Sequence, residues 1–151
     1  MTAKTTTEKQ ALSKMLIEHW EQTGSKLAQL AEELPEDKFE IAAVAGLRTP
    51  GDVLRHVAFW NRYVAAVVRG GKAEDAANEL PKDSYCTKAQ VLTALQESAF
   101  EAATALRGYF TGLTPDKAGL VVTFIEHTSE HYGQLVVYAR CLGIVPPASR
   151  S

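Results

Sequence analysis

TPDKAGLVVTFIEHTSEHYGQLVVYARCLG, residues 114–143, carries the signals of one long α-helix. Thr114 is typical of a helix N-cap, Pro115 suits the first helical position, and Asp116 places a negative charge where the helix dipole favours it. Gly143 follows the last apolar residue, at a position where glycine often ends a helix. The stretch therefore predicts a helix that begins after Thr114 and ends before Gly143.

The apolar residues of this stretch recur with the 3.6-residue period of a helix. The inward stripe is predicted to hold Leu120, Phe124, His127, His131, Gln134 or Leu135, Tyr138 and Leu142. His127 and His131 stand at i and i+4, where Cβ atoms lie about 5–6 Å apart on one face, close enough for both imidazoles to reach one ion. The HExxH glutamate of metalloproteases is absent, and a lone HxxxH pair is more often two histidines satisfied by their neighbours.

A second helix with the same starting signals lies upstream. Thr49-Pro50-Gly51-Asp52 combines an N-cap, a proline at the first helical position and an acid in the first turn. Gly70-Gly71 provides the end of this helix. Its predicted inward stripe holds Val53, His56 or Val57, Trp60, Val64 and Val67. A third histidine, His56, therefore falls on an apolar stripe, where an unpartnered imidazole is costly.

Two further helices complete the prediction. The first spans about Thr7 to Glu33 and is stopped by Pro35, whereas the third begins at a Thr87/Gln90 capping box and runs to about Gly112. Their predicted inward residues are Leu12, Leu16, Trp20, Leu27, Leu30 and Leu34, then Val91, Leu95, Ala102, Leu106 and Tyr109. The connection at 36–48 could form a helical turn or lie extended. We therefore expect a single all-α domain over residues 1–151, folded as a four-helix bundle without strands.

Three histidines on inward stripes favour one shared explanation. In helical bundles, metal sites are built from side chains that project inward from facing helices. Three neutral imidazoles suit zinc, nickel or iron, and three protein ligands leave coordination positions open for water or a substrate. We therefore predict a metal site formed by His56, His127 and His131.

Other polar residues give weaker signals. His19 is expected at the edge of the site, in a structural or rim role, and Glu126 and Glu130 are expected to be solvated surface acids. Gly133 indicates either a close approach of another group or a tolerated surface glycine. Four aromatic residues could wall a pocket, although such residues are more often plain core: Trp60, Tyr63, Phe124 and Tyr138. No residue is identifiable as a general acid or base, so the catalytic residues remain unknown.

The composition excludes several classes of partner. The formal charge of −2, from 16 basic and 18 acidic residues, gives no basic face for nucleic acid. No apolar run approaches the roughly 18 residues of a membrane span, and no signal peptide is visible, so the expected location is cytoplasmic. The two cysteines, Cys86 and Cys141, match no CxxC motif and are expected to stay reduced.

TPGDVLRHVAFWNRYV and EHTSEHYGQLVVYARCLGIVPPASR together resemble the DinB-like (DNA-damage-inducible) family of bacterial metalloenzymes, over nearly the whole chain. The resemblance rests on the helix-two histidine, His56, and on the pair His127 and His131 followed by Gly133 and Gln134. It implies an up-up-down-down bundle with a long crossover connection, commonly a homodimer, in which the three histidines bind a divalent metal.

What the resemblance implies about activity is less specific. Certain relatives are S-transferases or isomerases that use low-molecular-weight thiols such as bacillithiol or mycothiol. Many relatives carry His-His where this chain has Glu130-His131, so transfer of one particular activity is unsafe. We expect either a metal-dependent enzyme acting on a small molecule, as a thiol transferase or a hydrolase, or a non-catalytic dimeric helical protein with a structural or vestigial metal site.

Overall fold

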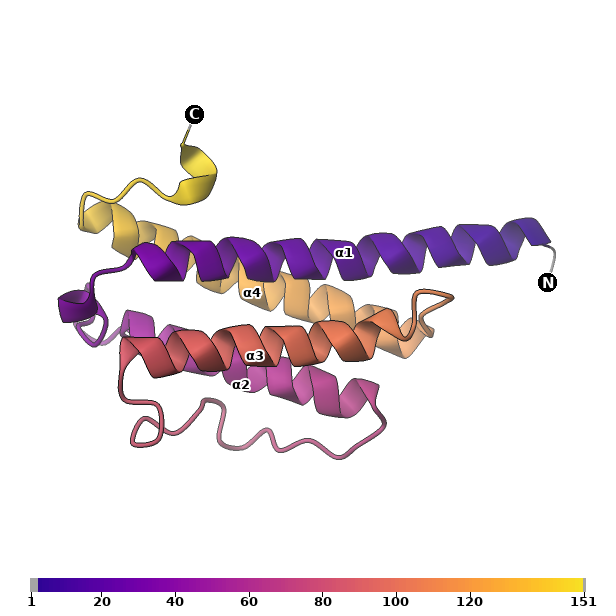
Figure 1. The fold of residues 1–151 in the computed structure, drawn as a ribbon, viewed down its shortest axis with the longest axis horizontal. Coiled ribbons are helices and arrows are strands. Elements are labelled where there is room, and N and C mark those ends of the chain that lie inside the picture. The colour runs from indigo at the N-terminus through magenta and orange to yellow at the C-terminus, as the bar shows by residue number, and fades with distance from the viewer. Residues whose placement is uncertain (1–2, 151) are drawn as a thin grey trace.

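The computed structural model describes residues 3–150, which form helices and connections without a strand (Figure 1). The elements are α1 (Ala3–Glu33), the 3₁₀ turn η1 (Glu36–Lys38), α2 (Pro50–Val68), α3 (Lys88–Arg107), α4 (Pro115–Cys141) and the 3₁₀ turn η2 (Pro147–Ser149). The four α-helices pack side by side as a bundle, which confirms the predicted fold class. None of the described helices combines the length and the apolarity that a membrane crossing requires.

The predicted N-caps start three of the helices. Thr49 Oγ1 accepts a hydrogen bond from the Asp52 backbone N–H at 3.0 Å, and the Asp52 carboxylate accepts one from the Thr49 N–H at 3.2 Å. The Thr87 hydroxyl caps α3 in the same way, with Gln90 as the reciprocal partner. Thr114 caps α4 through the Lys117 N–H. These local hydrogen bonds place the first turns of α2, α3 and α4 where the sequence predicts them.

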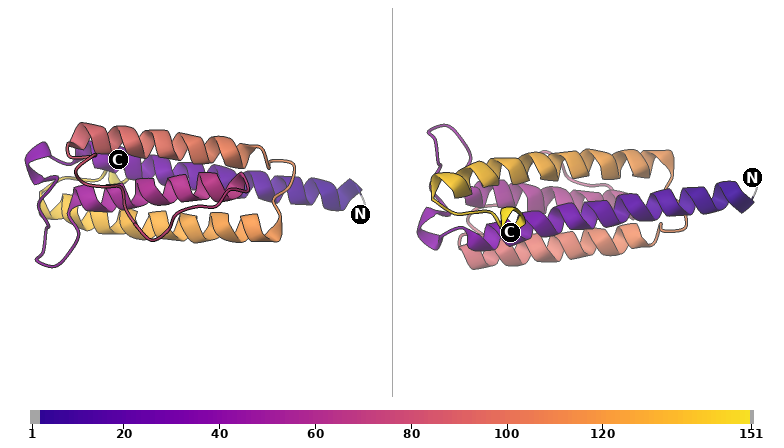
Figure 2. Two further views of the ribbon diagram at one scale, coloured as in Figure 1. Left: turned by 90° about the horizontal axis from the view of Figure 1, so that it is seen from below. Right: turned by 90° about the horizontal axis from the view of Figure 1, so that it is seen from above.

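The helices run in the order up, down, down, up. Figure 1 shows α1 and α4 pointing one way and α2 and α3 the other, and the views in Figure 2 agree. The up-up-down-down order implied by the resemblance is therefore wrong. Because α2 and α3 are parallel, the chain must return along the bundle between them, and residues 69–87 form this crossover (Figure 1). The predicted long crossover connection is confirmed.

The core confirms most of the predicted inward residues of α1, α2 and α3, whereas on α4 only Leu135 and Tyr138 of the predicted stripe are buried. Leu12 on α1 is 55% exposed and Leu142 after α4 is 40% exposed, although both were expected to face inward. Around Leu12 the buried face of α1 passes through Ser13 and Ile17 instead, and the first turns of this helix extend past the other three (Figure 1). Helix α3 ends at Arg107, earlier than predicted, so Tyr109 lies beyond it and is half-buried.

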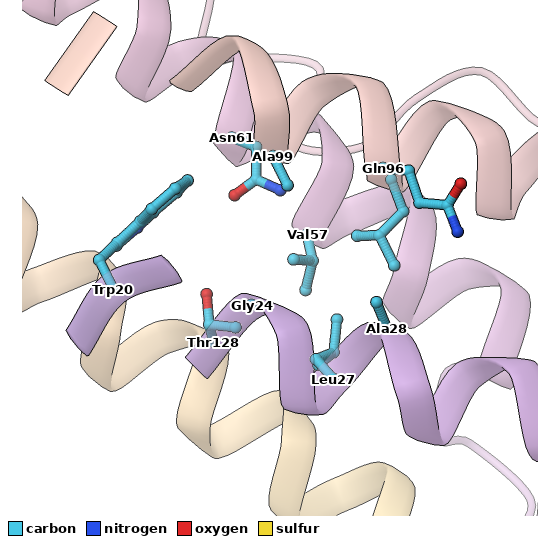
Figure 3. A pocket seen from close by; sticks show the side chains of 10 residues that line it. Trp20, Gly24, Leu27, Ala28, Val57, Asn61, Gln96, Ala99 and Thr128 are labelled. Atoms are coloured by element: carbon cyan, nitrogen blue, oxygen red, sulfur yellow. The ribbon is translucent and has the colours of Figure 1, made fainter. Parts of the chain in front are cut away.

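A small internal cavity marks the centre of the bundle. It measures about 30 Å³, which is room for roughly one water molecule. Figure 3 shows Val57 from α2 and Thr128 from α4 at this cavity, together with Trp20 of α1. Each of these α2 and α4 residues follows a histidine, and successive helical residues are turned about 100° from one another. His56 and His127 are therefore turned away from the cavity at the bundle centre.

Both long connections are held against α2 by one buried side chain. Arg55 is 1% exposed, and its guanidinium donates to both carboxylate oxygens of Glu40 at 2.7–2.8 Å and to Asp52 Oδ1 at 3.0 Å. It also donates to the backbone carbonyl of Tyr85 in the crossover. The connection at 36–48, left open by the sequence, contains the turn η1 followed by irregular chain, and its Glu40 belongs to this ion pair. Cys86 and Cys141 are free and exposed, as expected.

Candidate metal centre

The three predicted histidines come together between α2 and α4. His56 Nε2 lies 2.9 Å from His127 Nε2, and one ring nitrogen from each of His56, His127 and His131 lies within 4.8 Å of the others. The ring centroids are 4.7–4.9 Å apart. Of the residues that the structure describes, no other His, Cys, Asp or Glu joins this group. The convergence expected from the sequence is therefore present, and the cluster could hold a metal ion.

The histidines are neutral at physiological pH. Burial lowers the pKa of His56 to about 4, and the nearby Arg48 and His131 charges act in the same direction. Burial, assisted by the other two histidines, also lowers the pKa of His127 to about 4, and burial lowers that of His131. A neutral imidazole keeps a lone pair, which is the form that binds a metal. The cluster therefore needs to release no protons from cationic histidines when it takes up an ion near neutral pH.

The crossover connection sets the tautomer of His56. Its Nδ1 lies 2.5 Å from the backbone carbonyl oxygen of Asn78. A carbonyl can only accept, so Nδ1 carries the hydrogen and Nε2 presents its lone pair to the other histidines. Asn78 adopts a positive φ of 60°, and its side-chain oxygen accepts from Trp60 Nε1 at 3.1 Å. Asparagine tolerates this backbone conformation better than most residues.

A chain of hydrogen bonds sets the tautomer of His131. Tyr138 donates its hydroxyl hydrogen to the Arg48 carbonyl at 2.9 Å, so its oxygen accepts from Gln134 Nε2, also at 2.9 Å. Gln134 Oε1 is then left to accept from His131 Nδ1 at 3.1 Å. The chain is consistent only when His131 carries its hydrogen on Nδ1. Its Nε2 is therefore free for a ligand, in the outer-shell arrangement that is usual for metal-bound histidine.

His127 is the member of the cluster whose hydrogen bonding is incomplete. Because His56 Nε2 has no hydrogen, the 2.9 Å contact between the two Nε2 atoms requires His127 to donate. The lone pair then sits on His127 Nδ1, which is buried and has no hydrogen-bond partner among residues 3–150. An unsatisfied buried polar atom costs about 1–3 kcal/mol. Binding of an ion at His127 Nε2 would require the hydrogen to move to Nδ1, and Nδ1 would then be an unpaired donor instead of an unpaired acceptor.

The spacing of the nitrogens fits a single ion after small side-chain movements. Zinc–nitrogen bonds of about 2.0–2.1 Å in tetrahedral geometry place ligand nitrogens roughly 3.3 Å apart. One pair is closer than this, at 2.9 Å, and all three atoms lie within 4.8 Å. Rotations that move ring nitrogens by about an ångström would bring the set into range. The donor set contains only neutral imidazoles, which suits zinc, nickel or iron.

The remaining candidates lie outside the cluster. His19, Glu126 and Glu130 are exposed, and the prediction that the two glutamates are surface acids is confirmed. His19 lines an outer pocket with Lys26 and Tyr132 and does not approach the three histidines. A Cβ added at Gly133 would meet no atom within 4 Å, so Gly133 is an exposed glycine that no other part of the described chain approaches closely.

An aromatic cluster adjoins His127. We define the aromatic wall as Trp60, Tyr63 and Phe124, whose rings are 5.0–6.0 Å apart. The Phe124 and Trp60 rings lie 5.6 and 6.3 Å from the ring of His127. All three wall residues are half-buried, so part of each ring reaches solvent. Tyr138, also considered for such a wall, is instead buried and belongs to the hydrogen-bond chain of His131.

Replacing Gln134 with leucine is expected to weaken metal binding about 10–100-fold, the usual cost of losing an outer-shell partner of a ligand. Leucine keeps the bulk but removes the acceptor for His131 Nδ1–H and the donor to Tyr138. Competition with a chromophoric chelator measures the change, and Gln96→Leu on the exposed surface of α3 serves as the control. Equal affinity of Gln134→Leu and the control would contradict an orienting role for Gln134.

Comparison with known proteins agrees with the architecture. The family model described as the DinB superfamily matches residues 19–135, which include His56, His127 and His131 as well as the whole of α2 and α3. A search of curated proteins found no match. Since the matched region covers well over half of the sequence, this chain belongs to the DinB superfamily.

Proposed function

We propose that the protein is a divalent-metal-dependent enzyme that acts on a small molecule, with His56, His127 and His131 as the metal ligands. The observation that carries the proposal is that the charge and the orientation of the histidine rings already suit a metal ion. All three rings are neutral, and the Asn78 and Gln134 contacts aim two Nε2 lone pairs at the shared space.

The number of ligands favours catalysis over a structural role. Structural zinc sites are usually closed by four protein ligands, whereas catalytic sites have three and leave a position open. This cluster has three members within the described chain, and His127 and His131 are only half-buried, so an open position would face solvent. A bound divalent metal would lower the pKa of a thiol or water held at that position. The residues described above would orient the ligands around it.

The donor set narrows the choice of metal, and the family resemblance narrows the choice of reaction. Neutral imidazoles favour zinc or nickel, with iron as a further candidate. Use of a low-molecular-weight thiol as cosubstrate is supported by the resemblance to thiol-dependent relatives, and hydrolysis of a small ester or amide is the alternative reaction. A homodimer, a cytoplasmic location and the absence of a nucleic-acid partner stay predictions.

The proposal is tested by elemental analysis of untagged protein followed by an activity screen. We expect one equivalent of zinc, nickel or iron per chain, and turnover of electrophilic acceptors that requires both the metal and an added small thiol. Turnover of esters or amides without a thiol would assign the hydrolase reaction instead. Stoichiometric metal without either activity would favour the non-catalytic alternative, and absence of metal after growth with each ion would contradict the site.

A further inference from the structure

Arg48 stands at the other side of the histidines from the aromatic wall. It immediately precedes the N-cap of α2, and its backbone carbonyl ends the hydrogen-bond chain from His131 through Gln134 and Tyr138. Its side chain lies beside Glu79, the residue that follows Asn78, whose carbonyl oxygen contacts His56 Nδ1. The backbone and the side chain of Arg48 are therefore both held next to residues that contact the histidine cluster.

The guanidinium of Arg48 is only partly engaged. Its Nε lies 3.6 Å from Glu79 Oε2, with the two side chains 38% and 42% exposed. A pair this exposed contributes little to stability, so a ligand can displace or share it. No partner of the two terminal nitrogens is seen within residues 3–150. These nitrogens form the planar fork that binds a carboxylate through two parallel hydrogen bonds.

The spacing along α2 orders the three features. With a rise of 1.5 Å per residue, Trp60 lies roughly 16 Å along the helix from its N-cap Thr49, and His56 lies between them. On α4, Phe124 and Tyr138 flank His127 and His131 in the matching antiparallel order. A cationic group, the histidine cluster and an apolar surface therefore follow one another along the α2–α4 side of the bundle.

We propose that Arg48 binds the carboxylate of a substrate whose apolar or aromatic end packs on the aromatic wall. This inference rests on the proposed function, because it places the reacting part of the substrate at the histidines between the two ends. A carboxylate fits better than a phosphate monoester, since a single guanidinium beside the negative Glu79 offsets one charge better than two. Three neutral ligands around a divalent ion also leave a net positive centre, which favours an anionic ligand.

The test uses 4-phenylbutyrate, its uncharged amide and plain butyrate as probes, titrated calorimetrically into metal-free and zinc-loaded protein. The wild type is expected to bind phenylbutyrate about tenfold more tightly than the amide, as one charge-assisted contact allows. Arg48→Gln should lose this preference in both forms of the protein while it retains zinc. Phe124→Ala should reduce the advantage of phenylbutyrate over butyrate.

Matched controls come from residues of the same type elsewhere in the bundle. Arg69→Gln removes another exposed arginine, which directly follows the last residue of α2 and pairs with Glu101. Phe100→Ala removes a phenylalanine of α3 that is 69% exposed. Both are expected to bind the probes as the wild type does. A carboxylate preference that survives Arg48→Gln, or equal binding of acid and amide by the wild type, overturns the inference. If 4-phenylbutyrate does not bind to zinc-loaded wild-type protein, the inference is overturned as well.

The same titrations separate this inference from the proposed function. If the wild type takes up no zinc, the metal site is wrong, yet the metal-free titrations still decide whether Arg48 selects a carboxylate. If zinc binds and the Arg48→Gln variant behaves as the wild type does, the metal site stands and the substrate class proposed here is wrong.

Discussion

His131→Ala is expected to abolish stoichiometric metal binding, with a loss of affinity greater than the roughly 100-fold that an outer-shell change can cost. The substitution leaves two ligands in a cluster that has only three within the described chain. It also removes the ring that the Gln134 and Tyr138 hydrogen bonds orient. Metal content after dialysis, determined by elemental analysis, measures the result, and any metal-dependent turnover should disappear with the metal.

His19→Ala is the matched control for this experiment. His19 is an exposed histidine on α1 outside the cluster, so its loss should change neither metal content nor turnover. Helical content, followed by circular dichroism, should be unchanged in both variants, since His131 is half-buried on a helix whose cap and core lie elsewhere. Full metal content in folded His131→Ala protein would remove this histidine from the site.

The experiment also decides between the metal site and a bare hydrogen-bond network. In a network, His131 contributes one hydrogen bond to Gln134, and its removal would affect neighbouring side chains alone. Loss of a bound ion from His131→Ala and not from His19→Ala is a result that only a metal site explains.

The sequence predicts the features of this protein that depend on local contacts. Thr49, Thr87 and Thr114 were placed as N-caps because each cap and its partner lie within three residues of one another. The pairing of His127 with His131 follows from helical geometry in the same way. The inclusion of His56 needed only the assumption that two apolar stripes face each other.

The errors arise where periodicity cannot give the neighbours. Leu12 continues the apolar pattern of α1, yet it is exposed because α1 extends beyond the other helices (Figure 1). Leu142, which follows the end of α4, is exposed as well. A periodic stripe states which residues share a face, and tertiary packing decides whether that face is covered.

The groups that orient the histidines were the hardest to predict. Gln134 was named as an alternative on the inward stripe and through the family resemblance, without an orienting role, and Asn78 was missed. Asn78 is 22 residues from His56 in sequence and meets it only because the crossover folds back over α2. A lone asparagine in a polar loop gives no sequence signal that separates this role from an ordinary turn. Arg48 was also missed, because its backbone carbonyl joins the site through Tyr138, a residue far away in the sequence.

Arg55 is a further residue that the sequence does not mark. It stands between Leu54 and His56, and the helical period gives no reason to bury a guanidinium there. Its burial follows from the two connections, which bring Glu40 from the 36–48 segment and the Tyr85 carbonyl from the crossover onto the same face of α2. The Leu80 N–H also donates to the Arg55 carbonyl. Arg55 therefore holds the crossover against α2, and the next residue along the helix is His56, which the crossover orients through Asn78.

Arg55→Ala is expected to lower the free energy of unfolding by about 3 kcal/mol, the lower end of the range for breaking a buried ion pair. The lower end applies because Glu40 and Asp52 are 31% and 24% exposed and can be partly rehydrated. Urea denaturation followed by circular dichroism measures the change. Arg150→Ala is the control, since Arg150 pairs with Glu33 at the surface, where such a pair contributes at most about 1 kcal/mol.

The same substitution links the stability of the fold to the site. Without Arg55, the crossover loses its contact at Tyr85, and the Asn78 carbonyl is held less firmly against His56. We therefore expect Arg55→Ala protein that is still folded to bind metal about tenfold more weakly, because His56 loses its preset orientation. Equal stability losses for Arg55→Ala and Arg150→Ala would contradict the role of the buried ion pair. A large stability loss with unchanged metal affinity would show that the crossover and His56 are held independently.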